Sequence, residues 1–179
     1  MPLDGAMLSQ VKQEIETAVG ARVDRITQPG REELIVALRG RQGAYRLLIS
    51  VNAASPRVHF TRAAVENPKT PPMFCMLMRK LLGSAQLIEV RQAGLDRILE
   101  LDFDTIDELG DHVTLTLCVE IMGRHSNLII RRPDGKIVDS IKRIDTSMSS
   151  VRPILPGLTY TLPPAPMEKL NLLETSADA

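Results

Sequence analysis

The sequence predicts an α+β fold, in which antiparallel strands form β-sandwich-like sheets or one strongly bent sheet, with two main helices. Three observations support this prediction. Short β-type segments follow one another at the close spacing of antiparallel hairpins. Helical periodicity occurs in two stretches before residue 165. Hydrophobic residues make up 44% of the 179 residues and charged residues 25%, which is ordinary for a globular domain with a sizeable core.

The helices are expected at residues 6–19 and 73–82. Apolar residues recur at helical spacing in the first helix, and Gly20 ends it. The second helix follows a Pro-rich loop at 67–72 and ends at Gly83. β-type segments are expected at 22–27, 34–38, 45–51, 57–61, 86–91, 97–103, 113–121, 127–131 and 137–144, with turns at 28–30 and 132–136. Residues 146–166 are rich in Ser and Pro and are expected to form an extended connector.

Several classes of protein are disfavoured. No apolar run is long enough to span a membrane, and no basic segment precedes an apolar one as in a secretory signal. Cys75 and Cys118 are isolated, and the three histidines share no metal-ligand spacing, so we expect no zinc site and no disulfide framework. The chain has neither a G-x-S-x-G elbow nor a Gly-rich phosphate loop. A reduced cytosolic location without a cofactor is the simplest interpretation.

The charges are unevenly distributed, although the net charge is zero. Residues 99–120 hold seven acidic residues and no Lys or Arg, whereas residues 124–143 hold six basic residues and two acidic ones. The basic segment is either a face that meets phosphate or a solvated strand surface. Aromatic residues are few and scattered, so RNA, if bound, is expected to be recognised through shape and phosphate contacts and not through base stacking.

The first candidate site is Asp96-Arg97, which opens a predicted strand after Gly94. Beyond it, Leu99, Leu101 and Phe103 share one face of the strand, and Ile98, Glu100 and Asp102 share the other. An Arg at the start of an apolar face needs a partner, because a lone buried guanidinium is costly. The pair is either a functional site or a salt bridge at a strand end.

The second candidate site is the polar run Arg124, His125, Ser126 and Asn127, which follows Gly123 between two β-type segments. Guanidinium, imidazole and amide donors in one turn suit a phosphate or a ribose hydroxyl. Ser and Asn also tie hairpin turns together through their own side chains. The pattern leaves both interpretations open.

The N-terminus offers a third candidate. Pro2 would be the terminal residue if Met1 were removed, and a free proline amine can act as a nucleophile. Asp4 lies close by, either as a functional carboxylate or as the N-cap of the first helix.

These places carry a resemblance to the NFACT N-terminal domain of the RqcH/NEMF family, whose bacterial members were long labelled fibronectin-binding proteins. The matching stretches follow the family's order and are distributed over nearly the whole of residues 3–164. They are 3–5, 71–80, 94–98, 107–111, Met122-Gly123-Arg124-His125-Ser126-Asn127, 139–142 and 155–157. The resemblance implies an NFACT N-terminal domain at 1–164. Residues 165–179 would then begin a following helical domain, truncated here.

The resemblance also implies a function. Family members bind a large ribosomal subunit that carries a stalled peptidyl-tRNA, recruit charged tRNA, and extend the nascent chain with alanine without mRNA. Asp4, Asp96 and Arg97 match functional residues of the family, so contact with tRNA or rRNA is expected there, with Arg124 to Asn127 as a supporting surface. The domain is expected to be cytoplasmic, ribosome-associated and non-catalytic, because the ribosome performs peptide transfer. Neither membrane nor DNA is an expected partner.

The family domain is similar to the N-terminal domain of formamidopyrimidine-DNA glycosylases, which use a terminal proline with an adjacent acid. Pro2 fits the first requirement, but Leu3 occupies the position of the acid. A glycosylase-like lesion enzyme and a fibronectin-binding adhesin are therefore the alternatives to an RNA-binding domain.

Overall fold

The computed structural model describes residues 5–93, 97–145, 147 and 152–163. These residues contain a nine-stranded sheet in the order β4-β3-β2-β1-β5-β6-β7-β8-β9, in which every neighbouring pair is antiparallel. The elements are α1 (Gly5–Glu16), β1 (Arg22–Gly30), β2 (Glu33–Gly40), β3 (Gly43–Ser50), β4 (Arg57–Phe60), α2 (Met73–Leu82), β5 (Gln86–Ala93), β6 (Ile98–Ile106), β7 (His112–Glu120), the 3₁₀ turn η1 (Gly123–His125), β8 (Asn127–Arg131) and β9 (Ile137–Ser140). Within the described part of the chain, no helix is long and apolar enough to span a membrane.

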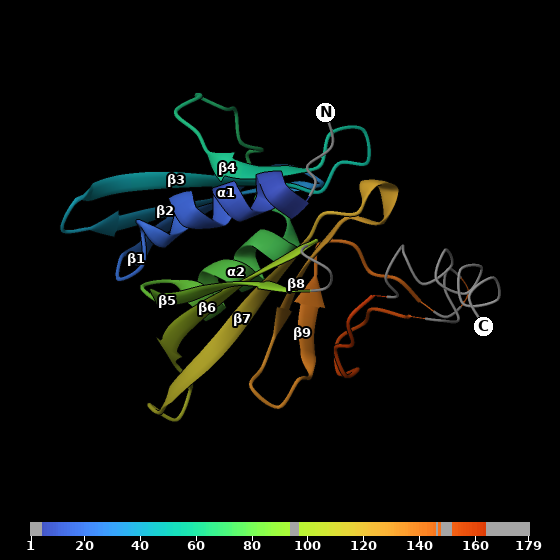
Figure 1. The fold of residues 1–179 in the computed structure, drawn as a ribbon. Helices are drawn as coiled ribbons and strands as arrows, with labels where there is room; N and C mark the ends of the chain where they lie inside the picture. The colour runs from blue at the N-terminus through green and yellow to red at the C-terminus, as the bar shows by residue number, and fades with distance from the viewer. Residues whose placement is uncertain (1–4, 94–96, 146, 148–151, 164–179) are drawn as a thin grey trace, which may run out of the picture.

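The sheet bends where β1 meets β5. These two strands pair at one position, Arg22 with Gln86, whereas the other neighbours pair over several. Strands β1 to β4 therefore form one half of the sheet and β5 to β9 the other (Figure 1). Helix α1 contacts β4 and β5, and α2 contacts β1 and β6, so each helix packs against both halves. The predicted α+β class with two helices is confirmed. Of the two expected arrangements of the strands, the structure has the single bent sheet and not sandwich-like sheets, because the β1–β5 pair joins the halves.

One core cluster lies between the two halves and the helices. It includes Leu8 and Ile15 of α1, Met78 of α2, and the three residues predicted to share a face of β6, namely Leu99, Leu101 and Phe103. All are almost completely buried. Burial of each such side chain contributes about 2 kcal/mol to folding, so this face fixes the position of β6 and of the residues at its ends.

Several predicted boundaries differ from the structure, and three of them have consequences for the fold. Strand β1 continues through residues 28–30, which were predicted as a turn, because a bulge between Thr27 and Gly30 accommodates Pro29 in the ladder. Helix α1 ends at Glu16 instead of residue 19, and hydrogen-bonded turns follow it. Strand β9 ends at Ser140 instead of residue 144.

The described part of the predicted connector, residues 152–163, is not a free linker. We call these residues the C-terminal segment. Ile154 pairs with Ile144, and Thr159 pairs with Lys136, so the segment returns to the sheet. Ile154 is buried in a second small core cluster on the outer face of β6 to β8. An apolar patch on that face explains the return, because only a covering segment removes it from water.

Candidate functional site

The structure brings two of the predicted sites to the end of the sheet where β7 finishes and where β6 and β8 begin. Arg97 is half-buried directly before β6, and its carbonyl oxygen accepts a hydrogen bond from the Ile121 N–H at 3.0 Å. In the ladders, Glu120 at the end of β7 pairs with Ile98 on one side and with Asn127 on the other. Arg97 therefore lies beside the turn of residues 122–127, which we call the 122–127 turn. Asp4 and Asp96 lie outside the described residues.

Ser126 holds the 122–127 turn from inside. Its side chain is fully buried, accepts a hydrogen bond from the Met122 N–H at 2.8 Å, and donates one to the Gly123 carbonyl at 2.7 Å. Gly123 has φ +57°, a left-handed conformation that favours glycine. The hydroxyl therefore uses both its donor and an acceptor inside the turn.

Asn127 ties the same turn to the segment after β9. It is 2% exposed. Its Nδ2 donates to the Lys142 carbonyl at 2.9 Å, and its Oδ1 accepts from the N–H groups of Leu128 at 2.8 Å and Lys142 at 3.1 Å. The structure thus places Ser126 and Asn127 inside the protein, where they organise the turn.

Lys142 extends this connection to the other half of the sheet. Its Nζ donates to the Val51 carbonyl at 2.7 Å and forms an ion pair with Glu32 Oε2 at 3.0 Å. Val51 follows β3, and Glu32 lies between β1 and β2. Through Asn127 and Lys142, the 122–127 turn is therefore bonded to both halves of the bent sheet.

Arg124 and His125 have the opposite placement, because both are exposed. Arg124 Nε donates to His125 Nε2 at 3.3 Å, so the imidazole accepts through Nε2 in this arrangement. A guanidinium held on a rigid turn is suited to a phosphate, which it can bind through two parallel hydrogen bonds. Of the polar run predicted from the sequence, these two side chains are the ones that face outward.

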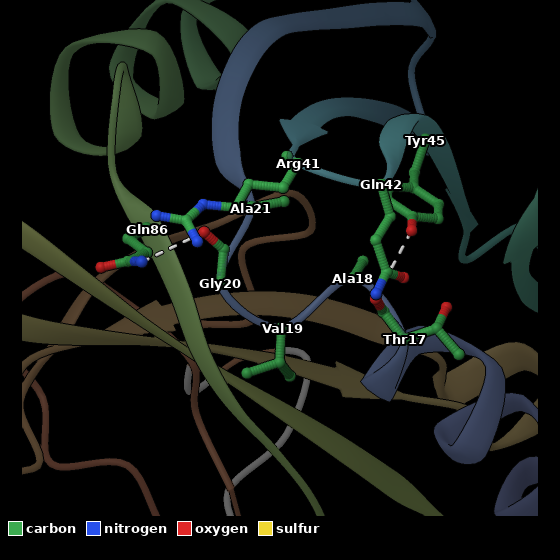
Figure 2. A pocket seen from close by; sticks show the side chains of 10 residues that line it. Thr17, Ala18, Val19, Gly20, Ala21, Arg41, Gln42, Tyr45 and Gln86 are labelled. Carbon is green, nitrogen blue, oxygen red and sulfur yellow. Dashed lines mark hydrogen bonds between the residues drawn. The ribbon is translucent and has the colours of Figure 1, made fainter.

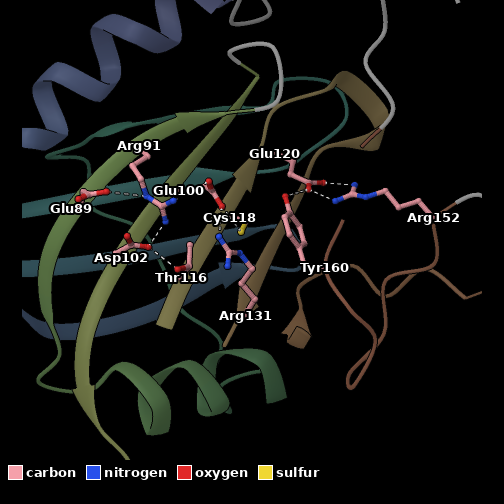
Figure 3. Close-up of polar contacts among 10 residues, drawn as sticks. All are labelled: Glu89, Arg91, Glu100, Asp102, Thr116, Cys118, Glu120, Arg131, Arg152 and Tyr160. Atoms are coloured by element: carbon pink, nitrogen blue, oxygen red, sulfur yellow. Dashed lines mark hydrogen bonds and ion pairs between the residues drawn. The ribbon is translucent and has the colours of Figure 1, made fainter. Parts of the chain in front are cut away.

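Arginines from β5 and from the base-rich segment on β8 neutralise buried acids of β6. Glu100 and Asp102 of β6 are buried, and each pairs with an arginine (Figure 3). Arg131 Nη2 donates to Glu100 Oε2 at 2.6 Å, and Arg91 Nη2 donates to Asp102 Oδ1 at 2.7 Å. Burial by itself lowers the pKa of Arg131, but the hydrogen bond to Glu100 and the neighbouring Cys118 raise it above its ordinary value. Sequence analysis missed this network, because nothing in the strand pattern shows that the polar face is covered.

The predicted basic face is smaller than the composition indicates. Arg131 pairs with Glu100 as described, Lys142 pairs with Glu32, and Arg143 pairs with Asp139 at 3.0 Å. The remaining basic residues of 124–143 are exposed: Arg124, Arg132 and Lys136. The surface available to an anion near the turn therefore centres on Arg124.

Other kinds of site find little support among the described residues. Burial raises the pKa of the Cys75 thiol and raises that of Cys118 to about 12, which makes both thiols poor nucleophiles. Within the described ranges, no group of three or more His, Cys, Asp and Glu side chains is placed to hold a metal ion.

A hollow of about 400 Å³ lies near the end of α1, lined by Thr17, Gly20, Tyr45 and Gln86 among others (Figure 2). Gln86 Nε2 donates to the Gly20 carbonyl at 3.1 Å, and the Tyr45 hydroxyl donates to the Thr17 carbonyl at 3.5 Å, so much of its polar lining is bonded internally. Gln86 is the first residue of β5, and Ala93, the last residue of that strand, lies close to Arg97 in the sequence. Because β5 has eight residues, these two ends are roughly 25 Å apart. The hollow is separate from the 122–127 turn.

Comparison with known proteins identifies the family of the chain. The family described as NFACT N-terminal and middle domains matches residues 4–179. The chain belongs to this NFACT family. The Rqc2 homolog RqcH of Bacillus subtilis is 41% identical over 180 residues, which cover 99% of this chain and 31% of that protein. The archaeal Rqc2 homolog of Methanocaldococcus jannaschii is 29% identical over 166 residues, 90% of this chain and 23% of that protein. The chain thus spans less than a third of the length of these NFACT relatives.

Solved structures show the same NFACT fold. The N-terminal domain of the fibronectin-binding protein PavA from Streptococcus pneumoniae superposes with a TM-score of 0.86 at 35% identity, covering 96% of this chain and 68% of that one. The N-terminal part of the fibronectin/fibrinogen-binding protein of Streptococcus suis has a TM-score of 0.86 at 40% identity, covering 90% and 61%. The resemblance predicted from the sequence is confirmed: the chain has an NFACT N-terminal domain similar to those of the Rqc2 homologs named RqcH.

Proposed function

We propose that this domain binds RNA in a ribosome-associated quality-control factor, where it contacts the obstructed large ribosomal subunit and tRNA and supports mRNA-independent alanine tailing of stalled nascent chains. Membership of the RqcH family supports the setting, which is cytoplasmic and ribosome-associated. Arg97 lies beside the turn that carries the exposed Arg124 and His125, and this position supports the proposal that these residues form the RNA-binding surface. We propose that alanyl-tRNA is the tRNA recruited.

The observation that carries the proposal is the exposed Arg124–His125 pair on a turn bonded to both halves of the sheet. A rigid cationic turn loses little conformational entropy when it binds phosphate, so ordering of the turn does not reduce the binding free energy. In this proposal Arg124 and His125 meet the RNA backbone directly. Ser126 and Asn127 act behind them, and Asp96-Arg97 and Asp4 complete the surface.

The proposed domain is non-catalytic. Its task is to orient tRNA on the ribosome, which performs peptide transfer. The buried state of both thiols supports this division of labour, because neither is available as a nucleophile in the folded domain. Residues 1–164 would form this unit, and residues 165–179 would lead into the next domain.

The proposal is tested with the full-length protein carrying Asp96→Ala together with Arg97→Ala. We expect alanine tailing of a stalled nascent chain to be lost while the fold is retained. Asp24→Ala with Arg39→Ala is the matched control, because this pair is also an acid and an arginine, 3.6 Å apart and exposed, on β1 and β2. Normal tailing by the Asp96 and Arg97 variant would contradict the site assignment.

A second candidate function is adhesion. Two structural relatives are described as fibronectin-binding or fibronectin/fibrinogen-binding proteins. Cell fractionation decides between the two functions. A pool confined to ribosomal fractions supports RNA binding, and a protease-accessible surface pool that binds fibronectin supports adhesion.

A further inference from the structure

Glu120 is a fully buried carboxylate that is held by the C-terminal segment (Figure 3). Both guanidinium Nη atoms of Arg152 donate to it, Nη1 to Oε1 at 2.9 Å and Nη2 to Oε2 at 2.5 Å, and the Tyr160 hydroxyl donates to Oε2 at 2.7 Å. We call Glu120, Arg152 and Tyr160 the Glu120 cluster. A buried carboxylate is tolerated only when it is paired and hydrogen-bonded, so its position depends on these two partners.

The backbone of Glu120 lies between the two parts of the proposed RNA surface. It is the last residue of β7, and only Ile121 separates it from the 122–127 turn. Its ladder partners are Ile98, which follows Arg97, and Asn127, which closes the turn. A shift of Glu120 would therefore move Arg97 and the turn relative to each other.

The two donors are themselves held in place. The Tyr160 ring lies under the guanidinium groups of Arg131 and Arg152, at 5.5 and 5.3 Å from its centroid. The Tyr160 N–H also donates to the Gly135 carbonyl at 2.7 Å, and Arg152 Nε donates to the Thr161 carbonyl at 2.9 Å. Burial raises the pKa of Tyr160, so its hydroxyl remains a donor to Glu120 throughout the physiological range.

We infer that Arg152 and Tyr160 are positioning residues for RNA binding, which through Glu120 hold Arg97 and the 122–127 turn in the geometry that binds RNA phosphates. This inference rests on the proposed function. It makes the C-terminal segment part of the RNA site, although the segment itself lies on the outer face of the sheet. Any displacement of the segment would weaken RNA binding without removing a cationic side chain from the surface.

The test compares three variants of the full-length protein: Tyr160→Phe, Arg152→Lys and the control Arg91→Lys. Tyr160→Phe removes one hydroxyl and keeps the ring, and Arg152→Lys keeps the charge and removes the two-pronged contact. Arg91→Lys weakens a comparable part-buried ion pair, but its partner Asp102 lies within β6, away from the turn. The measurements are affinity for purified large ribosomal subunits carrying tRNA, thermal midpoint, and hydrogen exchange of amides 121–128.

We expect Tyr160→Phe and Arg152→Lys to weaken binding roughly threefold to thirtyfold, the usual range for residues that act indirectly on a site. Amides 121–128 should exchange faster in both variants, and Arg91→Lys should leave affinity and these amides unchanged. Wild-type affinity in Tyr160→Phe and Arg152→Lys would overturn the inference. So would a fall in affinity in all three variants that is proportional to the fall in thermal midpoint. Arg97→Ala is measured in parallel. Unchanged affinity in Arg97→Ala would overturn the proposed site and this inference together, whereas a loss confined to Arg97→Ala would overturn the inference alone.

Discussion

Asn127→Ala is expected to destabilise the domain strongly, because Asn127 closes the 122–127 turn from inside. The substitution removes three hydrogen bonds and leaves the Leu128 N–H and both backbone polar groups of Lys142 without these partners. A buried group left unsatisfied costs about 1–3 kcal/mol. Because Lys142 is partly exposed, water can replace some of the lost bonds, so each bond should contribute near the low end of that range. We therefore expect the free energy of unfolding to fall by about 3 kcal/mol in total.

The assay is equilibrium urea unfolding of the chain, followed by far-ultraviolet circular dichroism. With a slope of about 2 kcal/mol per molar urea, the midpoint of Asn127→Ala should fall by about 1.5 M. Arg124→Ala is the matched control from the same turn. Its exposed side chain should contribute less than about 0.5 kcal/mol. A wild-type midpoint in Asn127→Ala, or an equal loss in Arg124→Ala, would refute the assignment of Asn127 as the buried support and Arg124 as the outward-facing residue.

Three further predictions concern charge, thiols and the N-terminus. In the full-length protein, Arg124→Ala should weaken tRNA binding and lower the slope of log affinity against log salt by about 1; an unchanged slope would exclude a phosphate contact. Cys75 and Cys118 should resist iodoacetamide in the folded chain and react after unfolding; rapid labelling of the folded chain would contradict their burial. Since the folded-state pKa of Cys118 is raised from 9.0 to about 12, its neutral thiol stabilises the fold fully below pH 9, and this contribution is lost as pH rises toward 12. Thermal midpoints across that range, compared with Cys118→Ala, measure the loss, and identical pH profiles would contradict it. Borohydride should trap no adduct between Pro2 and abasic DNA, and a trapped adduct would favour a lesion enzyme.

Much of the fold was predictable because its signals are local. Helix α2 has the predicted bounds, and the nine β-type segments correspond to the nine strands, because periodicity and turn residues act over a few positions. The join between β1 and β5 was not predictable. It consists of one strand pair, Arg22 with Gln86, and the backbone hydrogen bonds around it. These join residues more than 60 positions apart, and no local pattern marks them. For that reason the sequence left separate sheets and one bent sheet as alternatives.

The candidate site was predictable in part for a similar reason. Polar residues after Gly123 marked a turn, but burial was needed to separate Ser126 and Asn127 from Arg124. The alternation in β6 correctly placed Glu100 on the face opposite Leu99, but it did not show that this second face is covered. That face is covered by residues 152–163, whose Ser- and Pro-rich surroundings predicted a connector. Long-range packing therefore decided which charges are buried and which remain available to a partner.

The most direct test of the RNA-binding assignment is co-purification of the full-length protein with large ribosomal subunits and tRNA. The comparison is between wild type and a variant with both Arg97→Ala and Arg124→Ala. We expect the wild type to co-sediment with large subunits that carry tRNA, and the variant to remain in the soluble fraction with an unchanged thermal midpoint. Equal co-sedimentation of the two proteins would contradict the assignment of RNA binding to Arg97 and the 122–127 turn.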